Sequence, residues 1–135
     1  MALNTQMSDA AVNAEADALA VLLNNGYLRI YDGTQAATAD TAVGAQVLLA
    51  ELRFNATAFA AAVSGVLTAN AITGANAVAT IVATFYRVYA ANHTSVLFDG
   101  SVGTSLCNLN LLTTSLVSGQ PVNVTGFTFA AQETE

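Results

Sequence analysis

Lysine and tryptophan are absent from this chain of 135 residues, and cysteine, proline and histidine each occur once. The cations are three arginines, at positions 29, 53 and 87, against nine acidic residues, so the formal net charge is -6. Sequence-independent binding of nucleic acid requires a dense row of cations that displaces counterions from phosphates. The composition therefore argues against that function class, and we expect no nucleic-acid partner.

Residues that commonly carry catalysis or bind metals are also sparse. Cys107 is alone, so it cannot form an intramolecular disulfide, and its register with Leu109 and Leu111 predicts a small buried hydrophobic residue. His93 lies at a predicted hairpin tip, which rarely supplies the pocket and the orienting partner that a catalytic base needs. One histidine and one cysteine do not make a conventional zinc site.

Sites for calcium and phosphate are not indicated either. The aspartates lack the spacing of a calcium-binding loop, and the glycines are too scattered for a phosphate-binding loop; the residues considered are Asp32, Asp40, Asp99, Gly26, Gly33 and Gly44. We therefore predict a protein that is not an enzyme, with no cofactor and no metal.

The start of the chain, MALNTQMSDA, has no basic region, and the apolar run from Ala18 to Leu23 is too short for a signal peptide or a membrane span. We expect synthesis in the cytoplasm, no signal peptide and no membrane partner. A chain of 135 residues has the length of one domain with a single hydrophobic core. We divide the chain into an N-terminal helical arm, residues 1–25, and a β-sandwich domain, residues 26–135.

One helix is predicted, from Ser8 to Asn25. Ser8 is a suitable N-cap, Asp9 favours the positive end of the helix dipole, and Gly26 follows as a stop signal. Its apolar stripe consists of Val12, Ala16, Leu19, Leu22 and Leu23. This stripe has two interpretations: the helix packs on the edge of its own sheet, or it is an arm that docks on a neighbouring subunit.

The rest of the chain has strand periodicity. The run from Val78 to Tyr89, VATIVATFYRVY, is apolar on both alternating faces, which predicts a central strand buried on both sides. Its Val82, Tyr86 and Val88 side is the expected core. Further strands are predicted at 27–31, 46–54, 66–73, 95–98, 107–112 and 122–129, the last with a bulge at Gly126. Turns are predicted at Asp32-Gly33 and Asp99-Gly100, and residues 132–135 are expected to fray.

Seven or eight short strands with frequent turns predict a mainly β fold, an antiparallel β-sandwich or jelly-roll-like domain with one N-terminal α-helix. Two strands of this fold carry an aromatic-Arg-aromatic row, and such residues are enriched in protein interfaces. The rows are Tyr27, Arg29 and Tyr31, and Phe85, Arg87 and Tyr89. They predict surfaces that meet another protein, or an exposed sheet face on which each arginine covers its neighbours. With Leu19, Leu22 and Leu23 of the helix, these residues are the candidate interface.

Four stretches carry a family resemblance: LRIYDGTQAATADTA (28–42), LLAELRF (48–54), ATFYRVYAANHTSVLFDGSVGT (83–104) and LNLLTTSLVSGQPVNVTGFTF (109–129). They resemble small structural proteins of tailed bacteriophages and prophages. The resemblance implies a virion component, a capsid cement or decoration protein that stabilises the head lattice. It also implies a symmetric homo-oligomer, with a trimer favoured, and contacts with the major capsid protein or other virion proteins. It assigns no site residues.

Two alternatives stay open. The chain could be a structural part of the tail, neck or baseplate of the same kind of particle. It could also be a carbohydrate-binding or adhesin module that uses Tyr27, Tyr31 or Tyr89 as a platform for sugar rings.

Overall fold

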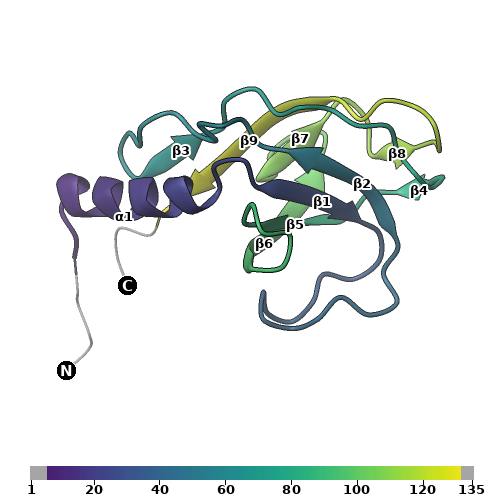
Figure 1. Cartoon of the computed structure of the whole chain (residues 1–135), viewed down its shortest axis with the longest axis horizontal. Helices are drawn as coiled ribbons and strands as arrows, with labels where there is room; N and C mark the ends of the chain where they lie inside the picture. Colours follow the sequence, from purple (N-terminus) through teal and green to yellow (C-terminus); the bar gives the residue numbers. More distant parts are fainter. Residues whose placement is uncertain (1–5, 132–135) are drawn as a thin grey trace.

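The computed structural model describes residues 6–131, and Figure 1 shows a single helix beside a curled sheet. Residues 1–5 of the predicted arm and the predicted frayed end, 132–135, lie outside the described residues. In chain order the elements are α1 (Asp9–Leu22), β1 (Tyr27–Tyr31), β2 (Leu48–Arg53), β3 (Val66–Thr68), β4 (Ile81–Val82), β5 (Phe85–Tyr89), β6 (Val96–Gly103), β7 (Leu109–Leu111), β8 (Ser115–Leu116) and β9 (Val124–Ala130).

Helix α1 begins where the sequence predicts, because the Ser8 side chain accepts the backbone N–H of Ala11 at 3.2 Å. The helix packs on its own chain. Its buried side consists of Val12, Ala16, Ala20 and Leu23, spaced by four, four and three residues. Leu22 is off this spacing and is exposed, so the predicted stripe is wrong at that position.

Two polar side chains fasten the helix to the chain that leads into β3. Asn13 Oδ1 accepts the N–H of Gly65, and Asp17 Oδ1 accepts the N–H of Ala62, each at 2.8 Å. Of the two predicted arrangements, the described helix therefore adopts packing on its own chain. The division into an arm and a domain stays a prediction.

The fold is mainly β, as predicted, and consistent with a β-sandwich-like domain. Seven strands form one sheet in the order β2-β1-β5-β6-β7-β9-β3, and β4 pairs with β8 in a small second sheet. The sheet curls around one core (Figure 1). All strand pairs are antiparallel, as expected, except β6 and β7, which are parallel.

The predicted central strand from Val78 to Tyr89 is wrong as one continuous strand. Ala83 donates its N–H to Thr114 O beside β8, whereas Thr84 donates to Tyr31 O of β1, so the chain changes sheets between these two residues. Only its second half forms β5, an interior strand that lies beside β6, the middle strand of the seven, and all five residues of β5 are buried. On the predicted core side Tyr86 and Val88 are buried, but Val82 lies in β4 and is exposed.

The core is centred on aromatic rings. Phe127 has four ring neighbours with centroids 5.1 to 6.3 Å away: Phe54, Phe59, Tyr86 and Phe98. They come from β5, β6 and the chain around β2, so this one ring joins distant parts of the curled sheet. The predicted bulge in β9 is confirmed one residue earlier than expected, because Asn110 pairs with Gly126 and Leu111 with Val124, leaving Thr125 as the extra residue.

The predicted turn at Asp99-Gly100 is wrong, since both residues lie within β6. At Asp32-Gly33 the chain bends and β1 ends, with Gly33 at a φ of 78°, but a long loop follows in place of a tight turn. Gly100 is needed for a packing reason: a Cβ there would lie 2.5 Å from Cε1 and Cζ of the buried Tyr86 ring.

We expect Gly100→Ala to lower the free energy of unfolding by about 1–3 kcal/mol, because the Tyr86 ring has to move within a packed core. Gly126→Ala is the control, because its Cβ would meet nothing within 4 Å. Urea denaturation of both variants measures the difference, and equal losses would show that the Tyr86 contact is not the cause.

Candidate interaction surfaces

The predicted Tyr/Arg rows lie side by side on the adjacent strands β1 and β5, flanked by β2 and β6. Arg29 pairs directly with Glu51 of β2 and with Arg87 of β5, and Arg87 pairs with Asp99 of β6. The four side chains form a row across the sheet, with two arginines in the middle and one acid at each end. We call this row the charged ladder. Opposite charges on adjacent strands balance two arginines that face each other.

The Arg87–Asp99 half of the charged ladder is buried. Arg87 Nε lies 2.7 Å from Asp99 Oδ1, and Nη2 lies 3.0 Å from Oδ2, with side-chain exposures of 2% and 4%. Arg87 Nη2 also donates to Thr38 O at 3.3 Å, which ties down the loop between β1 and β2. The hydrogen bonds to Asp99 raise the pKa of Arg87 despite its burial, so the guanidinium stays charged.

The Arg29–Glu51 half is partly exposed to solvent. Arg29 Nε donates to Glu51 Oε2 at 2.7 Å, and Arg29 lies 4.3 Å above the Tyr89 ring. Partial burial by itself raises the pKa of Glu51, but the hydrogen bonds with Arg29 and His93 outweigh it and hold the pKa below its usual range. Burial likewise acts to lower the pKa of Arg29, and its interactions with Glu51 and Tyr31 raise it overall.

His93 joins the hairpin tip to this half of the charged ladder. Its Nε2 lies 3.0 Å from Glu51 Oε1, and its ring stacks on Tyr27 with centroids 3.5 Å apart. The sequence predicts its position at a tip correctly but not these contacts. The only sign in the sequence that Glu51 joins this row is its place among the outward-facing residues of β2. For Asp99 the only sign is the pairing of β5 with β6.

Several of the predicted interface residues are buried within the chain itself. On β5, Phe85, Arg87 and Tyr89 are 1%, 2% and 7% exposed, so this row is not a free surface as predicted. The reason is that neighbouring strands and the loop between β1 and β2 contact it. Tyr31 and Leu23 are buried as well, whereas Leu22 is exposed and Tyr27, Arg29 and Leu19 are partly exposed.

We expect the protein to lose stability as the pH rises from about 10 to about 12. Burial, with a contribution from Tyr89, raises the pKa of Tyr31 to about 12, whereas an unfolded tyrosine titrates near about 10. In this interval the folded chain holds more protons than the unfolded chain, so unfolding becomes easier. Burial also raises the pKa of Tyr86. In Tyr31→Phe the free energy of unfolding should fall less steeply with pH across this interval, with Tyr86 supplying the remaining dependence; an unchanged slope would contradict the assignment to Tyr31.

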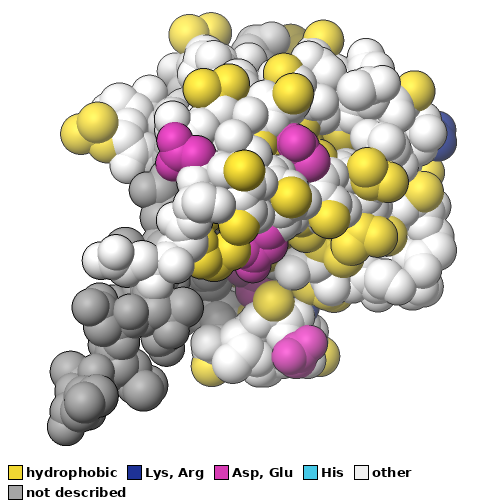
Figure 2. All heavy atoms as spheres, turned by 90° about the vertical axis from the view of Figure 1, so that its left-hand side faces the viewer, with side chains coloured by type: hydrophobic (Ala, Val, Ile, Leu, Met, Phe, Trp, Pro, Cys, Tyr) yellow, Lys and Arg dark blue, Asp and Glu magenta, His cyan; other side chains and the backbone are white. Residues whose placement is uncertain are grey.

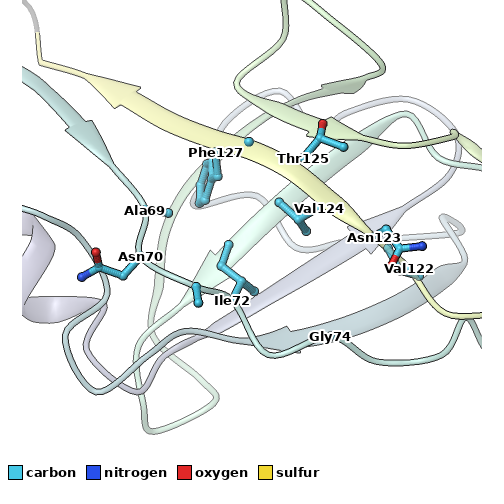
Figure 3. Close-up of a pocket in the computed structure, with 11 residues that line it drawn as sticks. Ala69, Asn70, Ile72, Gly74, Val122, Asn123, Val124, Thr125 and Phe127 are labelled. Carbon is cyan, nitrogen blue, oxygen red and sulfur yellow. The ribbon is translucent and has the colours of Figure 1, made fainter.

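A second feature is an opening of about 410 Å³ between residues 69–74 and β9. The two segments are joined at one end by Ala69 N–H to Phe127 O and at the other by Val122 N–H to Ala75 O. No backbone hydrogen bond joins the described residues 70–74 to 123–126. In Figure 3, Ile72 and Val124 point toward each other across this opening, while the Asn70 and Asn123 side chains lie near its two ends.

This opening is uncharged, because none of its lining residues is titratable. It can offer hydrogen bonds from amides and backbone, together with apolar contact, but it offers no general acid or base. Cys107 lies elsewhere, partly exposed in the bend before β7, and the prediction that it is buried is therefore wrong. Its backbone N–H donates to Asn110 Oδ1, a contact that holds the residue outside the strand.

A third feature is the uneven distribution of charge along the chain. Residues 54–86 and 100–132 contain no Asp, Glu, Lys, Arg or His. These stretches supply β3, β4, β7, β8 and β9, so one part of the fold is built without charge. Figure 2 views the helix end, where acidic side chains lie among hydrophobic ones and a basic side chain is visible only at the margin.

Among residues 6–131, no three or more His, Cys, Asp and Glu side chains gather as a metal site would require. Nor does the described part of the chain contain a helix long and apolar enough to cross a membrane. Comparisons with known protein families, with curated proteins and with solved structures give no match.

Proposed function

We propose that this protein is a structural subunit of a tailed-phage virion, and that it acts as a capsid cement protein through contacts with the head lattice. The observation that carries the proposal is the large uncharged part of the fold, on which large apolar side chains are exposed. Among these are Val78, Val82 and Leu112, at 65%, 53% and 68% exposure. Monomeric soluble proteins keep contiguous exposed apolar area small, and larger patches mark contact sites.

The same surface suits close packing in an assembly. Contacts between uncharged surfaces need no desolvation of ions, which is the main cost of burying charge. The charged ladder contributes to the fold of each subunit, since its buried pair lies within the chain. A cement protein of this kind would bind other copies and the major capsid protein, and would need no catalytic group.

Purified particles of the phage that encodes the chain provide the test. We expect the protein in a fixed ratio to the major capsid protein, measured by quantitative mass spectrometry, and on the head surface in an image reconstruction. A few copies in the tail, neck or baseplate would favour the alternative location. Absence from the particle would overturn the proposal.

One observation bears on the carbohydrate-binding alternative. Two of the three rings that it could use, Tyr31 and Tyr89, are buried, and the third, Tyr27, is stacked against His93. Stacking of a sugar requires an open ring face. Glycan binding that is lost in Tyr27→Ala and retained in Tyr31→Phe would nevertheless support that alternative.

A further inference from the structure

The end of the molecule opposite α1 is a two-stranded ribbon (Figure 1). Its segments, residues 75–83 and 114–122, run antiparallel. Ile81 pairs with Leu116 and Val82 with Ser115, and backbone hydrogen bonds continue the pairing at Ala77 N–H to Gln120 O and Val122 N–H to Ala75 O. Five large apolar side chains on and beside this ribbon are exposed: Val78, Ile81, Val82, Leu112 and Val117. We call these five residues the apolar end.

The five side chains of the apolar end have no place in the core of their own chain. Consecutive residues of a strand point to opposite faces, yet both Ile81 and Val82 of β4 are exposed. Their buried neighbours, Ala83 and Leu116, already fill the adjoining core. The apolar end is therefore free to bury its side chains only against something outside the described chain.

The distribution of charge favours a second copy of this chain as the partner that covers the apolar end. The chain carries a net charge of -6, so two copies repel each other wherever acidic residues approach. The helix end carries Asp9, Glu15 and Asp17 without any basic residue, which makes it a poor surface for self-contact. The apolar end lies wholly within the uncharged stretches, residues 54–86 and 100–132. It is a surface on which copies can meet without contact between charges of like sign, and it also carries exposed apolar side chains.

We propose that copies of this chain pack against one another through the apolar end, about a symmetry axis that passes beside β4 and β8. This inference rests on the proposed function, that the chain is an assembly subunit, and it names the surface and the partner. Symmetric closure brings the same side chains together from each copy, so each apolar residue is buried against its equivalents or near neighbours. Each copy gains the burial of Val, Ile and Leu side chains that its own core leaves exposed.

Sedimentation of the full chain tests the proposal. The wild-type protein should self-associate reversibly with concentration. Val82→Asp should weaken this association at least about tenfold, because it places an unpaired charge in the apolar contact. Val21→Asp is the matched control: Val21 is 66% exposed, but on helix α1 at the other end, and its replacement should leave the association constant unchanged. Leu112→Asp repeats the test at a second position in case Val82→Asp does not fold, as judged by circular dichroism.

The dependence of self-association on salt concentration is a second test, and it needs no variant. Association through the apolar end should strengthen as salt screens the repulsion between two chains of net charge -6, whereas contacts made by Arg29 and Glu51 should weaken. A strict monomer at high concentration, loss of association in Val21→Asp, or its full retention in both Val82→Asp and Leu112→Asp would overturn the proposal. A monomer that still binds capsids through these residues would place another virion protein on the apolar end, leaving the proposed function intact.

Discussion

Replacement of Arg87 by alanine is expected to lower the free energy of unfolding by about 3–5 kcal/mol. The change leaves the Asp99 carboxylate buried, at 4% exposure, without the two hydrogen bonds that Arg87 gives it. An uncompensated buried charge is far more costly than the loss of an ion pair in water. Guanidinium denaturation monitored by circular dichroism measures the loss.

Arg29→Ala is the control, because the Arg29–Glu51 pair has the same 2.7 Å separation but side-chain exposures of 26% and 32%. Its removal should cost about 1 kcal/mol, since water screens the pair and solvates the remaining carboxylate. Replacing both buried partners, Arg87→Met with Asp99→Leu, should recover most of the stability lost in Arg87→Ala. Equal losses in Arg87→Ala and Arg29→Ala would contradict the assignment of the cost to burial.

Arg87 also connects the core of the sheet to the loop between β1 and β2. Because its Nη2 donates to Thr38 O, hydrogen exchange in residues 33–46 should quicken in Arg87→Ala beyond the change expected from global stability alone. The same loop should be unaffected in Arg29→Ala. This contrast separates the loop contact from the ion pair itself.

Phe127→Ala is the second change with a large expected effect, a loss of about 3–5 kcal/mol. Phe127 is 3% exposed and contacts rings from β5, β6 and the segment that follows β2, so its removal opens a cavity that no single strand can close. Phe129→Ala is the control on the same strand, because Phe129 is partly exposed and has one ring neighbour among the described residues, Phe98. Urea denaturation should show a clearly smaller loss for Phe129→Ala. Similar losses would mean that Phe127 is not the centre of the core.

Local sequence signals predict the ends of elements well in this protein. Ser8 caps α1, Asp32-Gly33 ends β1, and the parity change near Gly126 indicates the bulge in β9. Each depends on the geometry of a few neighbouring residues, such as a side chain that accepts a nearby N–H or a glycine at positive φ. The mainly β class follows in the same way from periodicity along the chain.

The same signals fail where an element changes its partner. Nothing in VATIVATFYRVY marks the point between Ala83 and Thr84 where hydrogen bonding moves from β8 to β1. Asp99-Gly100 has the composition of a turn, yet it continues β6, where Asp99 pairs with Arg87 and Gly100 with Tyr86 of β5. Pairing between distant strands decides both outcomes, and residue order does not record it.

The candidate surfaces, too, were predicted in part by the sequence and in part were decided by the tertiary structure. By itself the sequence determines that the chain is acidic, mainly β and poor in catalytic groups, and it selects Tyr27, Arg29, Phe85 and Arg87 as unusual residues. Only the tertiary structure decides that Arg87 forms a buried ion pair with Asp99 while Val78 and Val82 stay exposed. The physical reason is that burial depends on which strands and loops cover a residue, and a run of alternating side chains looks the same whether its cover comes from its own chain or from a neighbour.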